Sequence, residues 1–201
     1  MRGIAAALGL AVFLFAPCAP AQVIEFESRG LKYQTLTHNG VTIMFAQLAA
    51  HVREYTIFQV AVSNGSAGPY VIRPEDFYYL KNNSETVEAD SAQHVISMLM
   101  QKGTGSDVIK LVNTYETALY GIPNMKSTNG FETRRQNALA FGGAKLRAAA
   151  TAAAVALVQT KLAPGESTDG AIFVPLDTKA QATSGHLQVR TNTDIFDFNA
   201  E

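Results

Sequence analysis

The sequence predicts a mainly β fold of the α+β class, an antiparallel β-sandwich with a helical insertion at about residues 90–160. Apolar and polar residues alternate with a period of two on both sides of that segment. Within the segment, apolar residues recur at helical spacing instead. Neither flanking part holds enough strands to bury a face alone, so we expect strands from both parts to share one sandwich.

The first residues predict export. Arg2 supplies a positive charge, Ile4–Ala16 form an apolar run, and Ala19-Pro20-Ala21 has the A-x-A pattern of a cleavage site. The apolar run is too short for a permanent membrane-spanning helix. We therefore expect a signal peptide over residues 1–21 and a periplasmic or extracellular mature protein.

The mature chain is expected to be one domain over residues 22–201. Cys18 is the only cysteine, so the mature domain has no disulfide and no thiolate metal site. A lipoprotein anchored through Cys18 is disfavoured, because Pro17 directly precedes it. The formal net charge of −1 gives no indication of nucleic-acid binding, and no later segment is long enough to span a membrane.

Short strands are expected in the first part of the domain, Val23–Glu88. Every second residue is apolar and bulky in Val41–Phe45 and in Phe58–Val62. Turn-forming residues then interrupt the chain over Asn64–Pro69. Further strands are expected over Tyr70–Ile72 and Phe77–Leu80.

Three helices are expected in the insertion, starting at the capping residues Asp90, Ser106 and Asn129. Gly103 ends the first of them. The glycine pair Gly142-Gly143 is expected to kink or interrupt the third. The uncharged, alanine-rich run Ala148–Val158 predicts close packing against one of the two preceding helices.

The chain returns to β-structure through the polar stretch that begins at Leu162. Pro164-Gly165 is expected to form a turn, and the polar residues after it are expected to run up to a buried strand at Ala171–Val174. Two further strands are expected at His186–Arg190 and Ile195–Phe198. The helices should cover one edge or end of the sandwich, because a free edge invites aggregation.

Two stretches resemble telokin-like, immunoglobulin-like domains of bacterial secreted proteins and lipoproteins. They are VAVSNGSAGPYVIRPEDFYYL, Val60–Leu80, and LAPGESTDGAIFVP, Leu162–Pro175. The resemblance covers about half of the mature chain and implies an immunoglobulin-like sandwich with a role in the cell envelope or outside the cell. It supplies no catalytic residues, and the helical segment departs from the pattern of such compact domains.

Nothing in the sequence points to catalysis. G-x-S-x-G, H-E-x-x-H and EF-hand patterns are absent, and Gly103-Thr104-Gly105 lacks the third glycine and the preceding strand of a nucleotide fingerprint. We therefore expect a non-enzymatic envelope module without a cofactor, whose role is to bind another envelope component.

An alternative function is that of a copper or other metal carrier. His94 and Met98 are four residues apart on an expected helix, and residues at this spacing share a face. Imidazole and thioether ligands suit copper, especially Cu(I). The competing interpretation is that Met98 fills the core, as methionines commonly do.

A basic segment supplies the candidate partner-binding residues. Between Lys126 and Arg147, five cations face the single acid Glu132, which gives a local charge of +4. Such a segment would attract an envelope protein, an anionic envelope polymer or lipid headgroups by its charge. The competing interpretation is a solvated face paired with the acidic residues of Glu75–Asp90. The candidates within the expected helices are Arg134, Arg135, Lys145 and Arg147.

Overall fold

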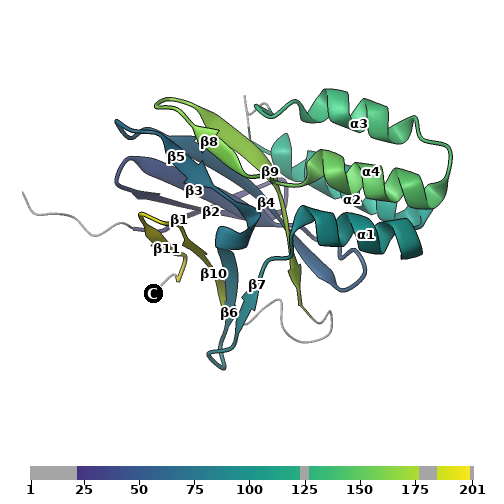
Figure 1. Cartoon of the computed structure of the whole chain (residues 1–201). Helices are drawn as coiled ribbons and strands as arrows, with labels where there is room; N and C mark the ends of the chain where they lie inside the picture. The colour runs from purple at the N-terminus through teal and green to yellow at the C-terminus, as the bar shows by residue number, and fades with distance from the viewer. Residues whose placement is uncertain (1–21, 123–126, 177–184, 200–201) are drawn as a thin grey trace, which may run out of the picture.

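The computed structural model describes residues 22–122, 127–176 and 185–199 of the 201, and Figure 1 shows their arrangement. In these ranges the chain forms eleven strands in three antiparallel sheets, together with four α-helices. The expected signal peptide, Cys18 and Lys126 lie outside the described residues.

The largest sheet has five strands, in the order β1-β2-β3-β4-β9. The hairpin turns Arg29-Gly30 and Asn39-Gly40 have positive φ at both residues, as type I′ turns require. β4 pairs with β9 from Tyr55–Pro175 to Ser63–Ser167. The strands are β1 (Ile24–Ser28), β2 (Leu31–His38), β3 (Val41–Gln47), β4 (Tyr55–Asn64) and β9 (Ser167–Pro175).

Two smaller sheets share an apolar core with one face of the large sheet. One has the order β11-β10-β6-β7, and the other pairs β5 with β8. Phe45 and Phe58 of the large sheet are packed with Tyr79 and Phe198 in this core. The strands are β5 (Tyr70–Ile72), β6 (Phe77–Lys81), β7 (Thr86–Glu88), β8 (Thr160–Leu162), β10 (Gly185–Arg190) and β11 (Ile195–Asp197). A short 3₁₀ helix, Pro74–Asp76, leads into β6.

Strands before and after the helices pair in all three sheets, as predicted. β4 pairs with β9, β6 with β10, and β5 with β8. The helical segment is therefore inserted into a β-structure that its two flanks complete together.

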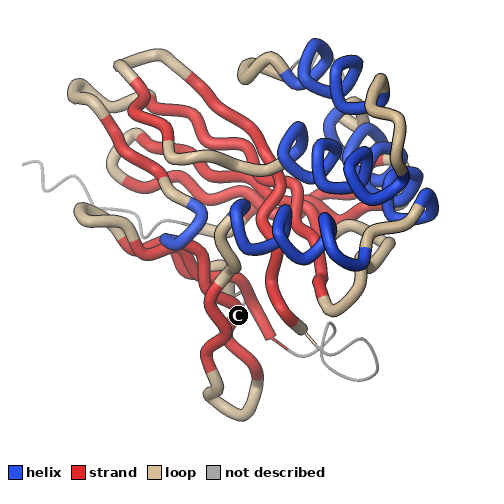
Figure 2. Tube along the Cα trace, turned by 45° about the vertical axis from the view of Figure 1, so that its right-hand side comes forward, coloured by secondary structure: helices blue, strands red, loops and turns tan. Residues whose placement is uncertain are grey.

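Four helices form the third layer, on the opposite face of the large sheet (Figure 2). They are α1 (Ala92–Lys102), α2 (Gly105–Leu119), α3 (Phe131–Leu139) and α4 (Ala144–Val155). The prediction of three helices is wrong, because Gly142-Gly143 separates α3 from α4 and the chain turns back there (Figure 1). α4 packs against all three other helices, through alanines that allow close approach.

The helix starts differ slightly from the predicted positions. Gly103 ends α1 as predicted. Asp90 precedes the α1 cap and accepts a hydrogen bond from the Tyr55 hydroxyl at 2.6 Å. The capping residues of α1, α2 and α3 are Ser91, Thr104 and Gly130.

The outer edge of β9 is covered by the segments that flank the helices. The Asp90 amide donates to the Phe173 carbonyl, and the Leu157 amide donates to the Ala171 carbonyl, both at 2.8 Å. We expected the helices to cover an edge or end of the sandwich, but they pack on a face of the large sheet, and the segments just outside α1 and α4 cover its edge.

β9 starts earlier than predicted, because its polar residues belong to the strand. Asp169 is buried and accepts hydrogen bonds from the Tyr115 hydroxyl and the Thr128 amide, both at 2.8 Å. Ser127 also donates to this carboxylate, and the Asn129 amide group donates to the Asp169 carbonyl. Asp169 thus holds the loop before α3 and the side of α2 against the sheet.

Candidate docking surface at the helical end

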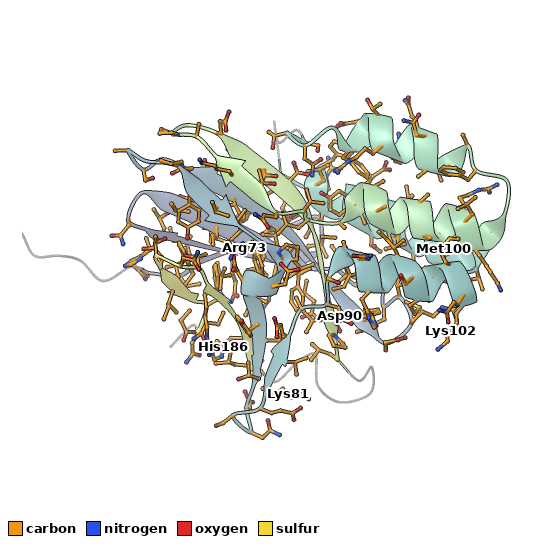
Figure 3. All side chains as sticks on the ribbon, viewed as in Figure 1. Arg73, Lys81, Asp90, Met100, Lys102 and His186 are labelled. Carbon is orange, nitrogen blue, oxygen red and sulfur yellow. The ribbon has the colours of Figure 1, made fainter. Side chains whose placement is uncertain are left out.

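The turn between α1 and α2 and the turn between α3 and α4 meet at one end of the molecule, away from the two smaller sheets (Figure 1). In Figure 1, α1 and α3 run to the right, and α2 and α4 return from that side. A Cβ atom on Gly103 would lie 2.8 Å from the Ala148 Cβ, so the α1–α2 turn adjoins the first turns of α4. We call Met100–Lys110 and Leu139–Arg147 the helical end. Met100 and Lys102 mark it in Figure 3, where Asp90 lies at the other end of α1.

An ion pair fastens the loop between β3 and β4 to the helical end. The Arg53 Nη2 atom lies 2.7 Å from the Asp107 Oδ2 atom and also donates to the Lys102 carbonyl. Arg53 holds a φ of 58°, in the left-handed region that a non-glycine residue adopts only when its surroundings enforce it. The same Asp107 oxygen accepts from the amide and the hydroxyl of Thr104, both at 2.8 Å. The start of α2 is therefore capped and its carboxylate is neutralised.

The pKa of Asp107 predicts how the stabilisation from this ion pair depends on pH. Burial opposes the charge of Asp107, but hydrogen bonds from Thr104 and Arg53 outweigh burial and hold the pKa below its usual value. A carboxyl pKa that is lower in the folded state stabilises the protein above the unfolded-state value. That stabilisation is lost as the pH falls through the folded-state pKa.

Replacing Asp107 with asparagine should lower the free energy of unfolding at pH 7 by about 1–2 kcal/mol, because hydrogen bonds to a charged group are lost. The difference from the native protein should begin to shrink below about pH 4, where the unfolded chain binds its proton. It should shrink further as the pH falls through the lower folded-state pKa of Asp107. Urea unfolding between pH 3 and pH 7 measures it. The nearby, exposed Glu54 provides a matched control, since Glu54→Gln should change little at any of these pH values. A difference that stays constant with pH would contradict the prediction.

Cations gather at the helical end. Lys102, Lys110 and Lys145 are exposed, and Arg147 is half-buried, with its Nε atom 3.0 Å from the Phe141 carbonyl oxygen. Asp107 is the only acidic residue in Met100–Lys110 and Leu139–Arg147. A polar cavity of about 430 Å³ opens at the α1–α2 turn, and it is lined by His51, Arg53, Thr104, Ser106, Asp107 and Lys110.

Large apolar side chains are exposed at the same end. Among the described residues, ten large apolar side chains are exposed, and half of them lie here. Ile109 is 61% exposed and Phe141 is 43% exposed, which is far from the burial that such residues usually reach. The others are Met100, Leu139 and Leu146. Apolar side chains that gather beside cations, rather than scattering singly, indicate an interaction surface.

The structure divides the four predicted partner-binding residues into two pairs. Lys145 and Arg147 belong to the helical end. Arg135 lies in the middle of α3 and forms an ion pair with Glu116 of α2 at 2.9 Å. Arg134 is half-buried beside a cleft of about 260 Å³ between α3 and α4, and its Nε and Nη2 atoms have no hydrogen-bond partner among the described residues.

Sequence reasoning missed the other cations of this surface. Lys102 and Lys110 flank the α1–α2 turn, and Arg53 comes from a β-hairpin loop, so all three are distant in sequence from Lys145. One available indication was the absence of any acidic residue between Asp90 and Asp107.

The two candidate metal ligands lie in different environments. The His94 side chain is 66% exposed, and its Nε2 atom is 3.9 Å from the Asp90 carboxylate. Met98 is 8% exposed and is part of the core between the helices and the sheet. Across the three described ranges, no group of three or more His, Cys, Asp or Glu side chains is placed to hold a metal ion.

The fold and this surface define a class: an α+β protein of three layers whose helical layer ends in a basic and apolar surface. Comparisons of the chain with models of protein families, with curated proteins and with solved structures find no match. No helix in the described part of the chain is both long enough and apolar enough to cross a membrane.

Proposed function

We propose that this protein is an exported, non-enzymatic module of the cell envelope that binds an anionic envelope component through its helical end. One observation carries the binding proposal. The helical end and the adjoining residues Arg53 and Glu54 hold five cations against two carboxylates, a formal charge of +3 in a chain of net charge −1. A positive surface of this kind raises the local concentration of an anionic partner. The signal-peptide pattern of residues 1–21 supports the export part.

The finer fold assignment is also a proposal. We propose that the large sheet and the two smaller sheets, which face one another across the apolar core that contains Phe45 and Tyr79, form an immunoglobulin-like sandwich. The resemblance of Val60–Leu80 and Leu162–Pro175 to such domains supports it. So does the position of these two segments in the structure, because they contribute neighbouring strands, β4 with β9 and β5 with β8.

Two tyrosines with raised pKa values have structural roles, and this supports the non-enzymatic part of the proposal. Burial first, and then the Asp169 carboxylate that its hydroxyl binds, raise the pKa of Tyr115 well above the usual value. Tyr55 has the same arrangement with Asp90, with a pKa raised by burial and by its hydrogen bond to that carboxylate. In both pairs the tyrosine hydroxyl donates to an acid that anchors a neighbouring segment, so packing accounts for the shifted pKa values.

Binding to heparin, a soluble polyanion, tests the proposed function. Replacing Lys110 and Lys145 together with alanine should weaken heparin binding by about tenfold and reduce its dependence on salt, because exposed charges act through screened attraction. Isothermal titration at two salt concentrations measures both effects. Stability should change by less than about 1 kcal/mol, since both lysines are exposed.

Two exposed lysines outside the helices serve as the control for total charge. The variant Lys32→Ala/Lys161→Ala removes the same charge from β2 and β8. It should keep most of the affinity for heparin. Equal weakening by the two double variants would show that only the net charge matters, and it would reject the helical end as the binding surface.

A further inference from the structure

We propose that the anionic component is a lipid surface, which the turn between α3 and α4 enters with Leu139, Phe141 and Leu146. This inference rests on the proposed function and narrows its ligand from any polyanion to anionic lipid headgroups above an acyl layer. The cations alone would suit a soluble polymer equally well. The apolar side chains make the difference, because a hydrated polymer offers them no apolar region to enter.

The order of side chains along the turn fits the depth profile of a bilayer interface. From Leu139 to Ala144 no residue is charged, and Lys145 and Arg147 follow in the first turn of α4. Interfacial segments place aromatic and leucine side chains at the boundary between headgroups and acyl chains, with lysine and arginine at the headgroups. The α3–α4 turn presents both types within nine residues.

The backbone of this turn is held in place by the residue that also supplies a charge. The Arg147 Nε atom donates to the Phe141 carbonyl, and its Nη2 atom lies 3.5 Å from the Gly142 carbonyl oxygen. These contacts tie the tip of the turn to the first turn of α4. The tip is therefore presented in an ordered conformation before it meets a surface, which lowers the entropic cost of binding.

The start of α4 adds to the attraction for phosphate groups. Gly143 is the capping residue and offers no side-chain acceptor, and the first turn of α4 contains no acidic residue. The positive end of the helix dipole is therefore not neutralised by its own side chains. By contrast, the first turn of α2 nearby contains the acidic Asp107, which forms a capping box with Thr104.

The same features argue against the other apolar partner that is always present, a second copy of this chain. Two copies that met through their helical ends would bring two surfaces of charge +3 together, and like charges across an interface oppose association. An anionic lipid surface satisfies both the charge and the apolar side chains.

A tryptophan at the tip reports the expected insertion. The chain contains no tryptophan, so Phe141→Trp introduces a single fluorescent probe. Vesicles of phosphatidylglycerol and phosphatidylcholine should shift its emission to the blue, whereas vesicles of phosphatidylcholine alone should not. Ile195→Trp, at an exposed apolar position in β11, is the matched control and should show no shift with either vesicle.

Two further variants in the Phe141→Trp background separate the contributions. Lys110→Ala/Lys145→Ala should weaken binding to the anionic vesicles by about 30-fold, since each basic residue near such a surface contributes about five- to sixfold. Leu139→Ser/Leu146→Ser should weaken vesicle binding and leave heparin binding unchanged.

The outcomes distinguish this inference from the proposed function. A blue shift that is lost in both double variants supports the lipid assignment. Binding to heparin without binding to vesicles overturns the lipid assignment and leaves the proposed function standing. Vesicle binding that is insensitive to Leu139→Ser/Leu146→Ser, with no shift at position 141, overturns insertion. Binding to neither probe overturns both proposals.

Discussion

Replacing Gly170 with valine should lower the free energy of unfolding by about 4 kcal/mol or prevent folding, because the new side chain would overlap backbone rather than a movable side chain. A Cβ atom at this position would lie 2.4 Å from the Leu157 Cα atom and 2.6 Å from its nitrogen. Leu157 cannot withdraw without breaking its hydrogen bond to the Ala171 carbonyl. Chemical denaturation followed by circular dichroism measures the loss.

Gly68 provides the matched control for this prediction. A Cβ atom there would meet nothing within 4 Å, and its φ is not in the left-handed region. Gly68→Ala should therefore change the free energy of unfolding by less than about 1 kcal/mol. If Gly170→Val were as mild as Gly68→Ala, the segment after α4 would not be packed against β9 as the structure has it.

Replacing Asp169 with alanine should lower the free energy of unfolding by about 3–4 kcal/mol. The substitution leaves the Tyr115 hydroxyl and the Thr128 amide without their acceptor, and each buried unsatisfied donor costs about 1–3 kcal/mol. The Tyr115 ring is 1% exposed, so water cannot readily replace the carboxylate. Thermal and urea denaturation of the variant give the change.

A double-mutant cycle with Tyr115→Phe shows whether this loss comes from the proposed network. Tyr115→Phe removes the donor and should cost about 1–2 kcal/mol alone. In the Asp169→Ala background it should cost much less, because the hydroxyl then has no partner to lose. Additive effects of the two substitutions would show that Tyr115 and Asp169 are not coupled.

The sequence pattern alone predicted the elements that depend on contacts between residues close together in the sequence. The alternation in Val41–Phe45 and Phe58–Val62 predicted β3 and β4, because side chains on a strand point to opposite faces. Gly103 predicted the end of α1. The glycine pair Gly142-Gly143 was recognised as an interruption, but local pattern alone did not decide between a kink and a complete reversal. The reversal depends on the packing of α3 against α4.

Contacts between distant segments were outside the reach of such patterns. Ser167–Gly170 has the composition of a loop, yet it forms the start of β9. Asp169 can be buried in this strand because the loop before α3, about forty residues away in the sequence, donates hydrogen bonds to its carboxylate. No local pattern indicates that Thr128 and Asp169 meet.

The residues of the candidate docking surface were likewise predicted only where they lie close together in the sequence. Lys145 and Arg147 were predicted because they lie in one basic segment. The same reasoning grouped them with Arg135, which instead pairs with Glu116 on the neighbouring helix. Lys102 and Lys110 join the surface only because α1 and α2 meet at the end where α3 turns into α4. The charge of the surface is therefore a property of the helix packing.

The pairing of β4 with β9 has a consequence for the order in which the chain can fold. The hairpins from β1 to β4 can form as soon as their residues are present, whereas the second neighbour of β4 arrives only after all four helices have been made. Closing such a long loop costs conformational entropy before any stabilising contact has formed, and this slows folding. Until β9 arrives, β4 offers an unpaired edge that is rich in apolar residues and open to pairing with another chain. The nascent protein is therefore most exposed to aggregation in the interval between the completion of β4 and the arrival of Ser167.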